Sequence, residues 1–238
     1  MTNKECYSTF CRETPDLPIF LHDWWMNAVC AGKQWDVLLY YDNEGNICAA
    51  MPYLLRQRAW MRYIVMPQMT QIGGIWVAPN IQQDTAMIQT ICSSFAQQLS
   101  ELKISYFYQH FPIHSVAIDG MKNLQFKVKE RFTYRIEDLS NLDNVIDAFS
   151  KNKKRQLQKA LSLHVTRDLN AEDFYRFHTQ CLADQNKQIS YSREFFLVIH
   201  RKTQRLQQSQ ILAIRNADNE ILAAAFLVWD RRSMYYLI

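Results

Sequence analysis

The side chains best suited to chemistry form a basic run in the second half of the chain. Between residues 151 and 159 the basic positions are Lys151, Lys153, Lys154, Arg155 and Lys159. Ammonium and guanidinium groups make point-charge and bidentate contacts to phosphate. Lys153, Lys154, Arg155 and Lys159 are therefore candidates for binding a phosphorylated partner such as coenzyme A, a nucleotide-linked precursor or tRNA. The alternative is a solvated helix face, which is what charge runs usually form.

Histidine spacing offers a second chemistry to consider. His110 and His114 lie four positions apart, the spacing at which two histidines on a helix can hold a metal. Pro112 between them argues against a regular helix, and no carboxylate motif accompanies the pair. We predict a loop and no metal site. No nucleophile spacing accompanies the remaining histidines, so the catalytic residues stay unknown; they are His22, His164, His178 and His200.

The positions of the glycines and the aromatic residues limit which ligand-binding motifs the sequence can contain. All five glycines precede residue 121, at Gly32, Gly45, Gly73, Gly74 and Gly120. The second half therefore carries no phosphate-binding glycine motif.

A stacking platform for nucleic acid needs basic residues on the same face as the rings. Only Lys103 lies near Tyr106 to Tyr108, so we predict that these tyrosines pack in a core.

The composition is that of an ordinary globular protein. The 238 residues are 48% hydrophobic and 21% charged, with a net charge of +4. So small an excess does not indicate DNA binding. No apolar run is long enough for a membrane span, and residues 1–11 lack the apolar core of a secretory signal, so we expect a cytoplasmic location. The six cysteines show no paired spacing, which favours buried thiols.

Two stretches of the chain look alike. Residues 37–64 predict a strand, a polar turn, a second strand, a basic turn at Arg56 to Arg58 and a third strand from Trp60. An ungapped shift of 174 positions aligns them with residues 211–238, which show the same order. We interpret this as an internal repeat of an antiparallel meander. Chance similarity of two hairpins is the alternative.

Helical segments surround these meanders. We predict helices at residues 22–31, stopped by Gly32, and at 84–102, followed by a strand at 104–108. One long helix is expected from Ser140, as its cap, to Ala160, with acids early and bases late to match the helix dipole. Leu142, Ile146 and Leu157 belong to its apolar face. A strand at 164–169 and helices capped by Asn170 and Ser192 complete the pattern.

Several stretches in this order resemble the GNAT-like acyltransferases, and the doubled arrangement resembles the Fem-type peptidyltransferases. They are residues 20–25, 49–53, 66–76, 131–139 and 149–160. The last looks like the family's N-x-R-R-x-x-x-K-A helix, with Lys154 where an arginine is usual and Gln158 where a base is common. The resemblance implies an α/β (α+β) fold of tandem units, each with a mostly antiparallel sheet flanked by helices. Residues 1–139 would form the first unit, and 140–238 a linking helix and an incomplete second unit.

The same resemblance implies transfer of an acyl or aminoacyl group to an amine. The donor, acetyl-CoA or another acyl donor, would lie at a splayed strand edge, with its phosphates on the loop between the meander and the next helix. In the first unit that loop, residues 73–79, departs from the acetyl-CoA pattern, and the second unit stops before it. We therefore expect a truncated chain that is inactive alone. The alternative is a non-enzymatic module that docks an anionic partner through residues 151–159.

An incomplete second meander also has a structural consequence. Its third strand, Met234 to Leu237, would leave an unpaired edge. Such an edge can pair with another chain. We therefore expect self-association through this strand.

Overall fold

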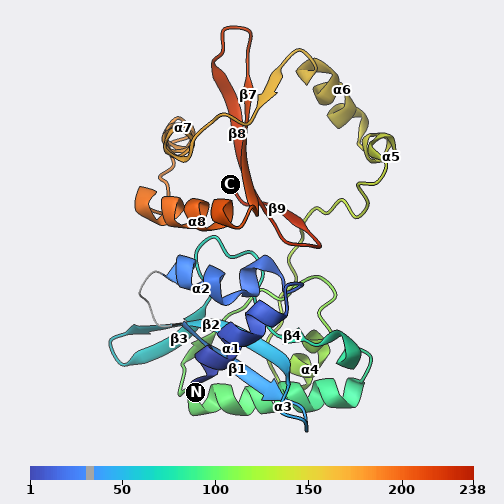
Figure 1. Ribbon diagram of the computed structural model, residues 1–238, viewed down its shortest axis with the longest axis vertical. Helices are drawn as coiled ribbons and strands as arrows, with labels where there is room; N and C mark the ends of the chain where they lie inside the picture. The colour runs from blue at the N-terminus through green and yellow to red at the C-terminus, as the bar shows by residue number, and fades with distance from the viewer. Residues whose placement is uncertain (31–34) are drawn as a thin grey trace.

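The computed structural model describes residues 1–30 and 35–238 and contains two sheets, each with its own helices (Figure 1). The first sheet has strands β1 (Trp35–Tyr41), β2 (Ile47–Arg58), β3 (Met61–Val65), β4 (Trp76–Val77) and β5 (Tyr106–Phe107). The order is β1-β2-β3-β5, and β4 pairs with the start of β2. All pairs are antiparallel except β3 with β5.

Helices cover the two faces of this sheet. Helix α3 (Thr85–Glu101) and α4 (Ala117–Asn123) pack on one face, through Ile91, Phe95 and Met121. On the other face lie α1 (Asn3–Glu13), the 3-10 turn η1 (Ile19–Leu21) and α2 (Asp23–Cys30). The predicted helices at 22–31 and 84–102 are thus confirmed, although Ala31 and Gly32 lie outside the described residues.

Helix α1 was missed in the sequence, although its start carries a local signal. Glu5 N–H donates to the Thr2 hydroxyl at 3.3 Å, and Thr2 N–H donates to the Glu5 carboxylate at 2.7 Å. These two bonds form a capping box, which satisfies N–H groups at the helix start. Tyr7 and Cys11 are the buried residues of the helix.

Three details of the first meander differ from the prediction. Arg56 to Arg58 belong to β2 rather than to a turn, and the chain reverses at Ala59, whose φ is 52°. Trp76–Val77 pairs with β2 inside the segment predicted as a loop. Strand β5 is shorter than predicted. In each case pairing with a neighbouring strand, which local sequence does not report, sets the boundary.

The second sheet is an antiparallel meander of β6 (His164–Thr166), β7 (Ser209–Arg215), β8 (Ile221–Trp229) and β9 (Met234–Tyr236). Helices α7 (Ala171–Ala183) and α8 (Arg193–Arg205) precede β7. Their predicted caps are confirmed: Asn170 accepts from Asp173 N–H at 2.9 Å, and Ser192 accepts from Phe195 N–H at 3.2 Å.

The predicted long helix is wrong, because two short helices replace it. Helix α5 (Leu142–Asp147) is capped by Asn141 rather than Ser140, and α6 (Lys151–Ala160) begins anew after Ser150. The Ser150 hydroxyl accepts from Lys153 N–H at 3.4 Å, and its extended ψ of 153° interrupts the helix. No residue of either helix is buried, and of the expected apolar face Leu142 and Ile146 are exposed while Leu157 is half-buried.

The first hairpins of the two sheets have the same register. Leu39 pairs with Ala50 and Ala213 with Ala224, so both partners are shifted by 174 positions. The turns match as well: Gly45 and Asn219 occupy equivalent positions and have φ values of 85° and 65°. The third strands do not follow the ungapped shift. Leu54 pairs with Val65 but its counterpart Val228 pairs with Tyr235, a shift of 170 from position 65 to 235, because the β2–β3 hairpin is longer.

One hydrophobic core crosses from one sheet to the other. It includes Trp25 of α2 together with Phe174, Phe196 and Phe226 from the second half. In Figure 1, α2 and α8 face each other where the two halves meet. The side chains of Cys11, Cys30, Cys48 and Cys92 are buried, as the sequence predicts. Across the described residues, no helix has both the length and the apolar character needed to cross a membrane.

Candidate functional site

The loop that follows β3 is where the resemblance would place donor phosphates, and it is filled by protein. Gly73 N–H donates to the His110 carbonyl at 2.6 Å, and Gly74 has a φ of 77°. A Cβ on Gly73 would lie 2.3 Å from Gln109 Oε1, and one on Gly74 would lie 2.8 Å from the Phe111 ring. Glycine is needed at Gly74, where a positive φ and the Phe111 ring exclude a side chain, whereas the atom nearest to Gly73 is the end of the flexible Gln109 side chain. The two glycines therefore do not form an open phosphate cradle.

The start of α3 is also unsuited to an anion. Its cap is Asp84, whose carboxylate accepts from Met87 N–H at 2.9 Å. The N-terminal end of a helix attracts anions through free N–H groups and the helix dipole. A carboxylate already in that place occupies one of those N–H groups and repels phosphate.

The parallel strands β3 and β5 separate after a short pairing. They align at Tyr63 with Tyr106 and at Ile64 with Phe107, and Tyr108 N–H donates to the Ile64 carbonyl at 3.0 Å. Beyond this point the Met66 sulfur accepts from His110 N–H at 3.3 Å. The side chain of Met66 thus occupies the place where the strands splay apart.

The predicted phosphate ligands lie together on α6, at the outer edge of the second half in Figure 1. Lys153, Arg155 and Lys159 are exposed, and Lys154 forms a salt bridge with Asp147 at 3.0 Å. The expected match to the helix dipole holds only in part, for Asp143 in the first turn of α5 and Lys159 in the last turn of α6. Because the helix restarts after Ser150, the lysines at 151, 153 and 154 lie in its first turn, where the dipole disfavours positive charge.

The predicted loop at His110 and His114 is confirmed, because both residues lie outside the helices and strands. As a separate finding, no three His, Cys, Asp or Glu side chains within residues 1–30 and 35–238 are grouped in a way that could hold a metal. His110 Nε2 lies 2.9 Å from the Tyr108 hydroxyl. Burial, together with the charge of Arg131, lowers the pKa of His110.

The predicted core packing of Tyr106 and Tyr108 is wrong. Tyr106 and Tyr108 are 55% and 38% exposed, and they stack on each other with ring centroids 6.4 Å apart. The sequence could not show this face, because the strands that complete it lie more than 40 positions away.

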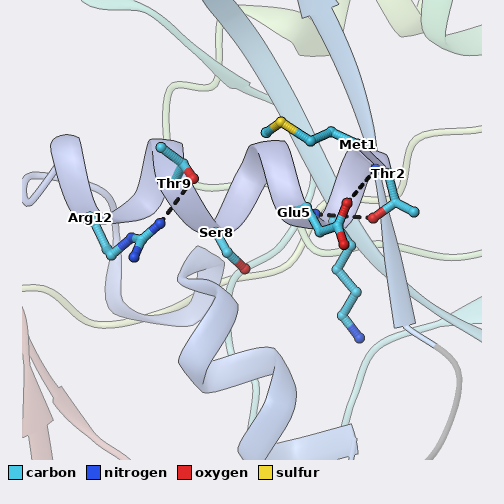
Figure 2. A pocket seen from close by; sticks show the side chains of 7 residues that line it. Met1, Thr2, Glu5, Ser8, Thr9 and Arg12 are labelled. Atoms are coloured by element: carbon cyan, nitrogen blue, oxygen red, sulfur yellow. Dashed lines mark hydrogen bonds between the residues drawn. The ribbon is translucent and has the colours of Figure 1, made fainter.

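A shallow depression on the outer side of α1 offers no reactive arrangement (Figure 2). Four of its polar residues bond in pairs along α1, and Lys4 lies over the Trp35 ring. Arg12 donates to the Thr9 hydroxyl at 2.9 Å, and Thr2 and Glu5 form the capping box. We do not assign it as a functional site.

Comparison with known proteins supports the fold. No protein-family model matches the sequence, and no curated protein does. The crystal structure of FemX matches with a TM-score of 0.57 and 14% identity, over 91% of this chain and 57% of the FemX chain. The chain therefore shares the fold of FemX. It spans little more than half of the FemX chain.

Two further structures match more weakly. Both are aminoglycoside antibiotic 6'-N-acetyltransferases. The one from Acinetobacter haemolyticus has a TM-score of 0.31 and 14% identity, over 57% of this chain and 92% of its own. The one from Acinetobacter baumannii has a TM-score of 0.28 and 15% identity, over 48% of this chain and 78% of its own.

Proposed function

We propose that the chain is part of an acyl- or aminoacyltransferase that acts on an amine. Residues 1–139 would be a first GNAT-like unit, and 140–238 would provide the linking helices and part of a second. The support is the Fem-type fold together with two hairpins whose strands pair in one register, shifted by 174 positions. A small-molecule or aminoacyl donor follows from that class of protein.

Within this proposal the first unit is not the donor site. The observation that carries this is the packing of Gln109 and Phe111 against Gly73 and Gly74, which fills the loop after β3. The Asp84 cap at the start of α3 adds a negative charge where phosphates would lie. The first unit would then support the second unit and contribute to acceptor binding. We propose accordingly that these 238 residues do not transfer acyl groups alone.

Thermal stability in the presence of acetyl-CoA tests this directly. A ligand that binds only the folded state, present at 100 times its Kd, stabilises a protein by about 2.7 kcal/mol. A micromolar donor site would therefore raise Tm clearly at about 0.1 mM acetyl-CoA. We expect no rise. A rise that calorimetry confirms as micromolar binding would refute the assignment, and its loss in a Gly73→Val variant would place the donor in this loop.

A binding module that docks an anionic partner through α6 is the second candidate. It is favoured by the exposed bases Lys153, Arg155 and Lys159, for which the described residues provide no ion pair. Lysines in the first turn of α6 oppose the dipole, and a bound anion would remove that cost. Inorganic polyphosphate is a suitable probe.

A charge reversal distinguishes this candidate from the first. Lys153→Glu with Lys159→Glu should abolish polyphosphate binding, while Lys187→Glu, an exposed lysine outside α6, should leave it nearly unchanged. Equal losses in both variants would indicate general charge attraction, and the docking role would be rejected.

A further inference from the structure

The first sheet carries an exposed face on which arginine and tyrosine side chains alternate across strands. Arg56 of β2 pairs with Tyr63 of β3, and Tyr63 pairs with Tyr106 of β5. Residues paired in adjacent strands project from the same side of a sheet, as do residues two apart in one strand. Arg58 and Tyr108 therefore join the same side. We name these five residues, Arg56, Arg58, Tyr63, Tyr106 and Tyr108, the basic–aromatic face.

The helices leave this face open. The opposite side of the sheet is closed by α3, against which Ile64 is buried and Phe107 packs. On the near side, α1 and α2 cover β1 and the first part of β2, where Val37 and Leu54 are buried in the core. The β2–β3 hairpin projects beyond those helices in Figure 1. Of the five residues, only Tyr63 is half-buried, and the other four are exposed.

The charges on the face are not neutralised by neighbouring acids. In the part of the chain that the structure describes, no salt bridge involves Arg56 or Arg58. A third guanidinium lies beside the tyrosines, because Arg131 Nη1 is 3.1 Å from His110 Nδ1 and the His110 ring also contacts Tyr108. Positive charge and aromatic rings are thus combined on one surface.

We propose that the basic–aromatic face binds single-stranded RNA. Guanidinium groups neutralise backbone phosphates, and unpaired bases stack on exposed aromatic rings. Tyr106 and Tyr108 lie with an interplanar angle of 21°, so two neighbouring rings present nearly parallel surfaces to successive bases. An anionic membrane or an acidic peptide would use the arginines but not the paired rings. This proposal rests on the first sheet alone and is independent of where an acyl donor binds.

Fluorescence anisotropy with a labelled oligouridine strand tests the proposal. Tyr106→Val and Tyr108→Val should each weaken binding on the order of tenfold, because each removes a stacking surface while keeping strand propensity. With three phosphate contacts, log K should fall by about 2 per tenfold rise in salt. Arg56→Ala with Arg58→Ala should reduce that slope by about 1.4. The matched control, Arg201→Ala with Arg205→Ala on the exposed side of α8, should leave both quantities unchanged.

Other outcomes overturn the proposal. They are equal binding of duplex RNA, preferred binding of vesicles with anionic lipids, absence of binding at about 50 mM salt, or loss of binding in the α8 control variant instead of the face variants. Circular dichroism checks folding. If a valine variant unfolds, Tyr106→Phe and Tyr108→Phe, which keep the rings, must retain affinity, and the exposed arginine variants still decide the result.

Discussion

The contact between the two halves of the chain depends strongly on Asp230. One carboxylate oxygen accepts from Ile19 N–H at 3.0 Å and from the Tyr235 hydroxyl at 3.4 Å. The other accepts two N–H groups of the turn before β9, at 2.9 Å each. Asp230→Ala removes all four interactions at once.

The expected loss is about 3 kcal/mol of unfolding free energy. Ile19 is fully buried, so its N–H would lose its partner without gaining water, which costs about 1–3 kcal/mol. The turn N–H groups and the Tyr235 hydroxyl are less enclosed, and we assign them together about 1 kcal/mol. Burial and the nearby Asp230 charge raise the pKa of Tyr235 to about 12, so this hydroxyl remains a donor at neutral pH.

Asp16 provides the matched control. It joins the same two segments through a salt bridge to Arg231 at 3.2 Å, but its side chain is 52% exposed and that of Arg231 is 64% exposed. Exposed pairs contribute about 0–1 kcal/mol. Urea unfolding of both alanine variants measures the difference. If Asp230→Ala and Asp16→Ala lose the same free energy within about 1 kcal/mol, the assigned role of the Ile19 hydrogen bond is wrong.

Three further outcomes can be measured on the same chain. In urea unfolding, Gly74→Ala should lower the free energy of unfolding by about 3 kcal/mol, because a positive φ and a clash with Phe111 combine at this position. Gly45→Ala should lower it by only about 1 kcal/mol, because Gly45 has a positive φ but open space around it. Burial lowers the pKa of His200, so the unfolded chain takes up a proton at this residue at a higher pH than the folded chain does. The free energy of unfolding should therefore fall as pH drops below about 6.5, and His200→Phe should make this fall smaller. Light scattering at rising concentration should detect self-association through β9, and Tyr236→Lys should reduce it; monomers at every concentration would contradict this.

Local signals in the sequence predict correctly where a helix or turn begins when a side chain at its own end stabilises it. Asp84, Asn170 and Ser192 each accept a hydrogen bond from an N–H two or three positions into the helix that follows, and all three starts were predicted correctly. The same is true of the hairpin turn near Gly45, which needs a positive φ. In such cases the residue and the structure that it stabilises are neighbours in the chain.

Features made by distant strands could not be predicted in this way. The sequence argues against a stacking platform at Tyr106 to Tyr108 because only Lys103 lies near them along the chain, whereas β3 brings Arg56 into the same row from 50 positions away. The break at Ser150 was missed for a different reason. Ser150 can cap a helix as Ser140 can, but the apolar spacing continues across it and favours one unbroken helix.

The loop after β3 connects the fold to the proposed function. Its glycines face inward and pack on Gln109 and Phe111, while two of its glutamines face the second half. Gln68 donates to the Ser190 carbonyl at 2.5 Å, and Gln71 donates to the Tyr236 carbonyl at 2.7 Å. The same loop therefore packs on the first half through its glycines and hydrogen-bonds to the second half through Gln68 and Gln71. We therefore expect that a donor bound in the first unit would loosen these two contacts between the halves.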